Sequence, residues 1–477
     1  MTPFPATPAS RLAGASVVLL VACLALCAGC GATDDAAQRP PLQGAVLILL
    51  DTVRADHLSC YGYGRPTTPA LDALARSGVR FTQVVSQAPW TLPSVASLLA
   101  GRQPGHALDE RLSSSIVERL QAAGLVTAAF TEGGFVSRAF GFDRGFAAFE
   151  EEEGTVRLVQ PGEPVATPER QEGGIAHTFA RAAEWLRRQR ADRFFLLVHT
   201  YEAHTPYTNH DFAGGLRPGR VGSAFSLDTI ARLRSGEIAL DADEIEYTKA
   251  LYDGDIRNAD RHVETLLDTL RASGLADRTL VVVTSDHGEE LADHYPTNTG
   301  SHGHSLRDPL VMVPLIVADP GRRYPRPEVT AQVRLMDVLP TIADLLGVAV
   351  EPPVEGHSLV PLMEGVETAD RTALTGNTRR GPPRLGVRAL GFKYIVTTGP
   401  DETTPPLSPP PPARQLYDLA ADHAERRNLA AERPALVASL QRLLDGAPGD
   451  RPAGEEAVIE DGDAALRERL RALGYIE

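Results

Sequence analysis

The chain has 477 residues, of which 43% are hydrophobic and 6% aromatic, and its formal net charge is -15. This length exceeds that of one typical domain, and the apolar content is that of an ordinary globular protein with a substantial core. Binding along a nucleic-acid backbone requires many Lys and Arg side chains to replace condensed counterions, so we expect no nucleic-acid partner. A small anionic substrate is still compatible, since a metal and a helix N-terminus attract phosphate or sulfate locally.

The N-terminus has the pattern of an export signal. Arg11 precedes an apolar stretch at residues 12–26, and small residues lead to Cys30, as in a secretory signal that ends at a lipid-modified cysteine. We predict a lipoprotein signal peptide at residues 1–30 and a small, polar tether at residues 31–43. An uncleaved anchor and plain secretion are the alternatives. All three export the rest of the chain, and the first anchors it to a bacterial membrane through Cys30, in the periplasm or on the outer surface.

Beyond residue 43 the chain alternates apolar runs with helical patterns. The apolar runs at residues 45–50, 194–198 and 280–285 are continuous, as in strands buried on both faces of a parallel sheet. Apolar residues at helical spacing occur at residues 69–77, 93–100, 113–123, 172–189, 243–272 and 336–346. The alternation predicts an α/β domain at residues 44–384, with a mostly parallel central sheet flanked by helices.

The pattern changes after residue 384. Strands are predicted at residues 386–396 and 416–419, an exposed proline-rich loop at residues 405–412, and a helix at residues 432–444. We therefore predict a small C-terminal strand-and-helix subdomain at residues 385–445. A tail at residues 446–477 follows, with a last helix at residues 463–473.

Side chains that can carry chemistry follow the three apolar runs. Asp51 follows the first run, His199 the second, and Asp286 with His287 the third. Ligands of open α/β sheets bind at the carboxyl ends of the strands. We therefore expect these acids and imidazoles to lie together along one edge of the sheet.

A hydroxyl group comes from the segment at residues 90–94. Proline is tolerated in the first turn of a helix, so Pro93 places Thr91 near a helix start, where free amides favour an anion. Thr91 as a plain N-cap is the alternative. Beside Asp51, Asp286 and His287, however, Thr91 is predicted to be both a nucleophile and a metal ligand. Mixed oxygen and nitrogen donors favour Zn²⁺ or Mn²⁺, with Ca²⁺ or Mg²⁺ as alternatives.

Two loops carry further histidines. His199 and His204 lie just past the end of the second apolar run, and His302 and His304 lie in a glycine-containing loop at residues 300–305. Histidines beside a bound anion contact its oxygens or protonate the leaving group. We predict that His204 and His302 are catalytic and that His199 and His304 bind substrate. Structural or solvent-exposed histidines are the alternative.

Together these segments resemble the sulfatase family of the alkaline phosphatase superfamily. The resemblance is carried by residues 50–57, 60–63, 88–94, 285–289, 313–316, 416–419 and 425–429. It spans roughly residues 44–445. It implies the α/β fold of the family, its C-terminal subdomain, a divalent metal, and hydrolysis of sulfuric or phosphoric esters.

Two departures from the family pattern concern the mechanism. Family members that use formylglycine have Cys or Ser at the nucleophile position, followed by Pro two residues on and Arg four residues on. Here these positions hold Thr91, Pro93 and Val95, and threonine cannot be converted to formylglycine. In addition, His287 replaces the Asn of an Asp-Asn metal pair. The resemblance therefore implies a member whose threonine attacks directly, as in the phosphoesterase and phosphotransferase branches.

The sequence thus predicts an exported, metal-dependent hydrolase that cleaves a phosphate or sulfate ester through Thr91. The expected substrate is an anionic ester of a glycan, a lipid headgroup or a small molecule. A phosphotransferase acting on glycan or lipid headgroups is one alternative. A binding protein that has lost catalysis is another, although a retained metal site favours an enzyme.

Overall fold

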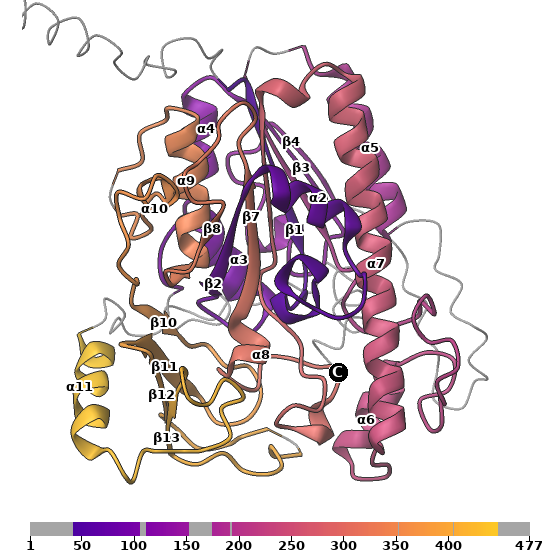
Figure 1. Ribbon diagram of the computed structural model, residues 1–477, viewed down its shortest axis with the longest axis vertical. Coiled ribbons are helices and arrows are strands. Elements are labelled where there is room, and N and C mark those ends of the chain that lie inside the picture. Colours follow the sequence, from indigo (N-terminus) through magenta and orange to yellow (C-terminus); the bar gives the residue numbers. More distant parts are fainter. Residues whose placement is uncertain are drawn as a thin grey trace, which may run out of the picture. The chain divides into compact units, whose positions relative to one another are not determined.

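The computed structural model describes residues 42–104, 111–151, 174–190, 193–351, 353–403 and 405–446 (Figure 1). The predicted signal peptide at residues 1–30, all but the last two residues of the tether, and the predicted tail helix lie outside the described residues. Within the described ranges, no helix combines the length and the apolar character that a membrane crossing requires.

A mostly parallel mixed sheet of nine strands forms the centre of the fold, in the order β4-β3-β5-β1-β6-β7-β2-β8, with β9 also paired to β2. Its strands are β1 (Gly44–Leu50), β2 (Val79–Val85), β3 (Val126–Thr131), β4 (Ala148–Glu151), β5 (Phe194–Thr200), β6 (Thr279–Thr284), β7 (Met312–Ala318), β8 (Glu328–Val329) and β9 (Val333–Arg334). Only β7 is antiparallel to its neighbours, β6 and β2, within this sheet. The prediction of a mostly parallel sheet is confirmed.

The three strands predicted from apolar runs lie side by side in the middle of the sheet. β1 pairs with β5 on one side and with β6 on the other, and every residue of the three strands is buried. Because side chains alternate along a strand, Leu47 packs into the core on one face of the sheet and Ile48 into the core on the other. Burial on both faces explains why the runs are continuously apolar.

Helices cover both faces of this sheet, as predicted (Figure 1). The helices α3 (Thr91–Ala100), α4 (Ile116–Ala122), α9 (Val338–Leu345) and α10 (Val360–Met363) contribute to the core on one face, and α2 (Pro69–Ser77), α5 (Gly174–Arg188), α6 (Leu227–Arg234) and α7 (Ala242–Ala272) to the core on the other. A one-turn helix, α8 (Asp308–Val311), precedes β7.

One shifted helix start and one unpredicted helix have local explanations. α4 begins at Ile116 rather than residue 113, because the Ser115 hydroxyl accepts the backbone N–H of Val117 in a capping box. α6 was not predicted, since its eight residues span little more than two turns. The Ser226 hydroxyl caps α6 by accepting the backbone N–H of Thr229 at 3.3 Å.

The C-terminal part of the described chain forms a second, antiparallel sheet with the order β10-β11-β12-β13. Its strands are β10 (Ala373–Thr375), β11 (Arg384–Ala389), β12 (Phe392–Thr397) and β13 (Arg414–Asp418), and α11 (Pro434–Asp445) packs on it. β10 comes earlier in the chain than the residue 385 at which the sequence pattern changes. The loop between β10 and β11 contains residues that line the site described below.

A buried ionic cluster joins the small sheet to the large domain. Lys393 on β12 has a side chain only 3% exposed, and its Nζ lies 2.8 Å from Glu425 Oε1 and also contacts Asp308 of α8. The neighbouring Arg388 contributes a second positive charge, 3.6 Å from Asp308. The paired charges offset each other where solvent cannot.

Replacing Lys393 with Met should destabilise the protein strongly, because the buried Glu425 and the partly buried Asp308 carboxylates then face each other with less positive charge. We expect a loss of about 3–5 kcal/mol in the free energy of unfolding, measured as a lower midpoint of urea denaturation. Arg427→Met is the control: Arg427 pairs with Glu432 on the surface, where it is 72% exposed, and such pairs contribute little. Equal midpoints for the two variants would contradict the role given to the cluster.

Candidate active site

The candidate site lies where β1 and β6 end beside the start of α3. The register places Leu49 opposite Thr284, so the residues that follow the two strands leave the sheet side by side. Asp51 comes directly after β1, and Asp286 and His287 follow β6 after one serine. Thr91, the first residue of α3, faces them from another element.

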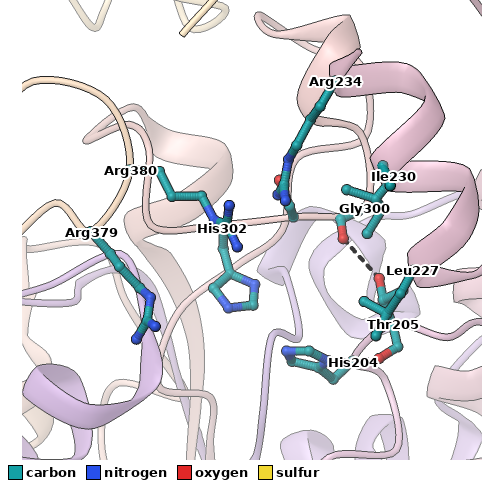
Figure 2. Close-up of a pocket in the computed structure, with 11 residues that line it drawn as sticks. His204, Thr205, Leu227, Ile230, Arg234, Gly300, His302, Arg379 and Arg380 are labelled. Atoms are coloured by element: carbon teal, nitrogen blue, oxygen red, sulfur yellow. Dashed lines mark hydrogen bonds between the residues drawn. The ribbon is translucent and has the colours of Figure 1, made fainter. Parts of the chain in front are cut away.

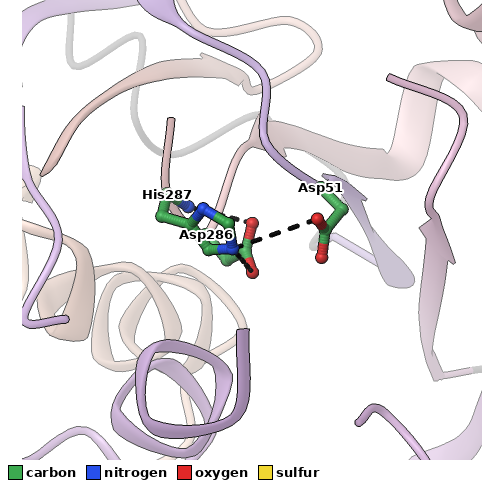
Figure 3. Close-up of side chains that lie close together, drawn as sticks. All are labelled: Asp51, Asp286 and His287. Atoms are coloured by element: carbon green, nitrogen blue, oxygen red, sulfur yellow. Dashed lines mark hydrogen bonds and ion pairs between the residues drawn. The ribbon is translucent and has the colours of Figure 1, made fainter. Parts of the chain in front are cut away.

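Asp51, Asp286 and His287 form a compact, fully buried cluster (Figure 3). Each offers one ligand atom, and these atoms lie within 4.8 Å of one another. His287 Nε2 is 3.4 Å from Asp286 Oδ2 and 3.9 Å from Asp51 Oδ1. The three residues therefore approach one point from two adjacent strand ends.

Backbone amides hold one oxygen of Asp286 and leave the other free. Asp286 Oδ1 accepts the backbone N–H of His287 at 2.9 Å and that of Thr52 at 3.4 Å, whereas Oδ2 has no hydrogen-bond partner. Thr52 reaches Oδ1 from a left-handed conformation, with φ of 60°. A β-branched residue is strained there by about 1–3 kcal/mol, so the surrounding structure must impose this geometry.

The two carboxylate oxygens of Asp51 differ in the same way. Its Oδ2 accepts the Thr91 hydroxyl at 3.3 Å and lies 3.5 Å from His199 Nε2, whereas Oδ1 has no hydrogen-bond partner. His287 also has one atom held and one left available. It donates from Nδ1 to the carbonyl of Gly288 at 2.8 Å. A neutral ring with a proton on Nδ1 presents a lone pair at Nε2.

The cluster therefore brings three lone pairs together in a place without solvent. Burial and the neighbouring Asp286 carboxylate raise the pKa of Asp51 well above its usual range. Such an arrangement is unfavourable unless a cation or protons neutralise it. The buried, unpartnered oxygens of Asp51 and Asp286, with one imidazole nitrogen, fit a divalent metal.

Thr91 is positioned as a fourth group of this cluster. It is fully buried, and its Oγ1 lies 3.3 Å from His287 Nε2 in addition to its bond to Asp51. Trp90, not Thr91, occupies the N-cap position, so capping does not account for the hydroxyl. Ser94 carries the other hydroxyl of this turn. It donates to the backbone carbonyl of Asp286 at 2.7 Å and thus ties the start of α3 to the segment that carries Asp286 and His287.

His302 lies next to the cluster, and His204 and His302 line a pocket (Figure 2). The ring centroids of His287 and His302 are 4.4 Å apart, and those of His302 and His204 are 5.0 Å apart. His302 contacts Glu289 Oε1 through Nδ1 at 3.1 Å, and His204 donates from Nδ1 to the Thr205 carbonyl at 2.8 Å. These contacts fix both rings.

The environment of these two histidines favours their neutral forms. Burial lowers the pKa of His204 to about 4. Burial and the neighbouring His287 lower the pKa of His302 well below its usual range. A bound anion would oppose this effect, because negative charge beside an imidazole stabilises its protonated form.

The two histidines predicted to bind substrate have other surroundings. His199 is fully buried behind Asp51 and directs Nε2 at its carboxylate. His304 faces away from the cluster: its Nε2 lies 3.6 Å from Glu290 Oε2, and the Tyr295 ring packs edge-on against it. Neither histidine is among the residues that line the pocket.

The pocket has a volume of about 570 Å³, part of it open to solvent. Besides the two histidines, it is lined by Arg234 at the end of α6, by Arg379 and Arg380 in the loop after β10, and by Thr205, Leu227, Ile230, Ala231, Gly300 and Ser301. The sequence reasoning did not single out the arginines, since charged residues far from the strand ends are usually surface ion pairs. The adjacent Arg379 and Arg380 in a loop were the only available signal.

Glu289 and Glu290 are further residues that the sequence reasoning left without a role. Both are buried, and they pair with His302 and His304 respectively. The signal for them was their position, two and three residues after the metal-site residue His287.

The comparison with known families agrees with this geometry. The model of the family described as Sulfatase matches residues 43–348. The chain belongs to the sulfatase family.

Two curated sulfatases illustrate the extent of the likeness. The ulvan-active sulfatase of Formosa agariphila is 27% identical to this sulfatase-family chain in an alignment 433 residues long, which covers 83% of the chain and 79% of that protein. Arylsulfatase K of Mus musculus is 29% identical over 206 residues, 42% of the chain and 36% of that protein. The match to arylsulfatase K thus spans little more than a third of the length of that protein.

Solved structures show the same fold. A putative sulfatase from Bacteroides thetaiotaomicron is similar with a TM-score of 0.66 at 20% identity, covering 84% of this chain and 91% of that one. A phosphonate monoester hydrolase of Agrobacterium radiobacter is similar with a TM-score of 0.65 at 21% identity, covering 85% of this chain and 95% of that one. The α/β architecture with its C-terminal antiparallel sheet is therefore that of solved sulfatase structures.

Metal binding should stabilise this sulfatase-family protein measurably. In chelator-treated protein the Asp51 and Asp286 carboxylates repel each other, and added Zn²⁺ or Mn²⁺ at 100 times its Kd should stabilise the fold by about 2.7 kcal/mol. We expect a corresponding rise in the melting temperature. Asp51→Asn should abolish this rise, because an amide is a weaker ligand without charge.

The control for the metal experiment is Asp268→Asn, which removes an exposed carboxylate that pairs with Arg271 on α7. This variant should respond to metal as the unchanged protein does. A metal-induced rise that survives in Asp51→Asn would place the metal elsewhere.

The neutral His204 should make the fold sensitive to acid. A pKa of about 4 in the folded state, against about 6.5 in the unfolded chain, means that only the unfolded chain binds this proton as pH falls from about 6.5 to about 4. The contribution of His204 to the free energy of unfolding is therefore fully present above this window and is lost within it, by about 2–3 kcal/mol.

His204→Gln should reduce this loss, measured as the shift in the urea midpoint between pH 7 and pH 4.5 in chelator. The exposed His210→Gln serves as the control and should retain the loss of the unchanged protein. An identical acid sensitivity in His204→Gln and the control would show that His204 is not held neutral.

Proposed function

We propose that the chain is an exported, metal-dependent hydrolase that cleaves a sulfate ester by direct attack of Thr91. The observation that carries this proposal is the position of Thr91 Oγ1, which is buried at the start of α3 and lies 3.3 Å from both Asp51 Oδ2 and His287 Nε2. Membership of the sulfatase family and the sulfatase activities named for its relatives support the reaction type.

Asp51, Asp286, His287 and the Thr91 hydroxyl would hold the metal, for which Zn²⁺ or Mn²⁺ suits the mixed donors best. The bound metal would supply positive charge that lowers the pKa of the hydroxyl and neutralises the oxygens of the ester. His199 supports this arrangement through its contact with Asp51 Oδ2.

The residues of the chain then have defined tasks in two displacements. In the first, the oxygen of Thr91 bonds to the sulfur, its proton passes toward Asp51, and the bond from sulfur to the leaving oxygen breaks. His302, oriented by Glu289, or His204 gives a proton to that oxygen. In the second, water bonds to the sulfur and gives one proton to the histidine that acted as acid, the bond to Thr91 breaks, and the Thr91 oxygen takes back its proton from Asp51, releasing hydrogen sulfate.

A phosphate ester is the second candidate substrate, and two observations favour it. Thr91 cannot become formylglycine, which the resemblance links to the sulfate-cleaving members of the family. A phosphonate monoester hydrolase also shares the fold along 85% of this chain. The residues would act in the same way on phosphorus.

We also propose that the protein acts outside the cell, on an ester of a glycan or of a lipid headgroup. The signal pattern at residues 1–30 favours an exported protein that is anchored through a lipid on Cys30. An extracellular ester of a glycan, as in the relative named as ulvan-active, or of a lipid headgroup would then be within reach.

Substitution of Thr91 tests the nucleophile. We expect Thr91→Ala to lower kcat/KM by roughly 10³-fold or more, as for other removed nucleophiles, whereas Thr91→Ser keeps a hydroxyl and should retain turnover. The measurement is hydrolysis of matched aryl sulfate, phosphate monoester and phosphate diester substrates by the metal-loaded full chain. The ester with the highest kcat/KM identifies the reaction.

Ser94→Ala is the control, because it removes the neighbouring hydroxyl of the same helical turn. It should lose far less activity than Thr91→Ala. Equal losses would contradict direct attack by Thr91, as would turnover that does not depend on Thr91. Transfer of the group to an added alcohol in preference to water would identify a transferase, and metal binding without turnover would favour a binding protein.

A further inference from the structure

We propose that the pocket beside Thr91 selects esters whose leaving group carries a second negative charge, which Arg234 and Arg380 bind. This inference rests on the proposed function, since it takes the ester to be cleaved at Thr91.

The charge of the pocket is opposite to that of the whole chain. The chain has a net charge of -15, yet three arginines and no carboxylate are among the described residues that line the pocket. Figure 2 shows the side chains of Arg234 and Arg380 reaching toward the space around His302 from different segments. A cavity lined by one sign of charge concentrates ligands of the other sign.

Arg234 lacks a negative partner of its own. Its only hydrogen bond to a described side chain is a weak one, from Nε to the neutral amide oxygen of Asn298 at 3.4 Å, and no ion pair joins it to a described carboxylate within 4.0 Å. Burial and the charge of Arg380 lower its pKa to about 9. A half-buried guanidinium beside a like charge is costly, and an anion between the two would offset that cost.

The loop that carries Arg380 is fixed in place. The backbone N–H groups of Arg379 and Arg380 both donate to the Gly303 carbonyl, at 2.7 and 3.0 Å. The Arg379 guanidinium also lies over the Trp90 ring, 4.9 Å from its centroid, in cation–π geometry. Trp90 precedes Thr91, so this loop is tied to the helix start that carries the nucleophile.

The position of the arginines assigns them to the leaving group. Thr91 and the residues of the metal cluster do not line this pocket, whereas His204 and His302 lie between the two regions. The scissile group must reach Thr91, so the remainder of the ester extends past the histidines into the pocket. Leu227 and Ile230 of α6 add an apolar wall, which suits a ring that bears a carboxylate or a second sulfate.

Binding of three product analogues to the metal-loaded full chain tests this directly. 4-Hydroxybenzoate carries a carboxylate, 4-hydroxybenzenesulfonate a sulfonate, and 4-hydroxybenzamide a neutral group of similar shape. We expect at least one anion to bind about tenfold or more tightly than the amide in calorimetry, as for a charge-assisted contact. The stronger of the two anions distinguishes a carboxylate from a sulfate-like group.

Arg234→Gln and Arg380→Gln should each remove most of this preference. Arg232→Gln is the matched control: it removes the same charge from the same helix, but Arg232 pairs with Glu237 outside the pocket, so the preference should persist. Melting temperatures verify folding, and Arg380→Gln carries the test if Arg234→Gln does not fold. Equal binding of all three analogues, or a preference that survives both variants, would overturn the proposal.

Turnover separates this inference from the proposed function. The sulfate and phosphate esters of 4-hydroxybenzoate and 4-hydroxybenzamide are compared, and Arg380→Gln should lower kcat/KM for the carboxylate ester about tenfold more than for the amide ester. Thr91→Ala should abolish turnover yet keep the binding preference. Anion binding through the arginines without turnover would support the pocket assignment and reject the hydrolase activity. Turnover without any anion preference would support the hydrolase activity and reject the pocket assignment.

Discussion

Two carboxylate oxygens and one imidazole nitrogen that converge at a buried point form the constraint on which the rest of the site depends. Asp51 Oδ1, Asp286 Oδ2 and His287 Nε2 converge where solvent does not reach. The other atoms of the three side chains are already bonded to backbone groups, to Thr91 or to His199. These contacts hold the side chains toward one another, and the atoms left without a partner fit a divalent cation. The left-handed backbone of Thr52 lowers the free energy of unfolding, and the fold tolerates this strain where it keeps the Asp286 carboxylate in place.

The fold supplies this constraint through the order of its strands. β1 lies between β5 and β6, so residues far apart in the chain leave the sheet at adjacent strand ends, where open α/β sheets bind ligands. α3 then adds Thr91 from its first turn, and Ser94 ties that turn to the Asp286 carbonyl. Thr91 and the Asp51, Asp286 and His287 cluster are thus held together by the contact of Ser94 with the main chain and of Thr91 with Asp51. The arginine pocket is built differently, from the end of α6 and a loop of the C-terminal sheet.

Sequence patterns predicted the parts that depend on local chemistry. Continuous apolar runs identified β1, β5 and β6, and the groups that follow them, Asp51, Asp286 and His287, do lie together in the structure. What could not be predicted depends on contacts between distant segments. His304 shares a loop with His302, but only the fold shows that it faces Glu290 instead of the pocket. Arg234 and Arg380 are some 146 residues apart and meet through tertiary packing, so no local pattern marks them.

The most direct test of the account is mass spectrometry of the metal-loaded protein, quenched with acid during turnover of its best aryl ester and then digested. Direct attack predicts that the peptide containing Thr91 gains one sulfuryl or phosphoryl group, with the label on the threonine oxygen, and that the same peptide before turnover has the mass of unmodified threonine. A label on another residue would contradict direct attack by Thr91. So would turnover with no adduct at any quench time, in both the unchanged protein and a slower Thr91→Ser variant.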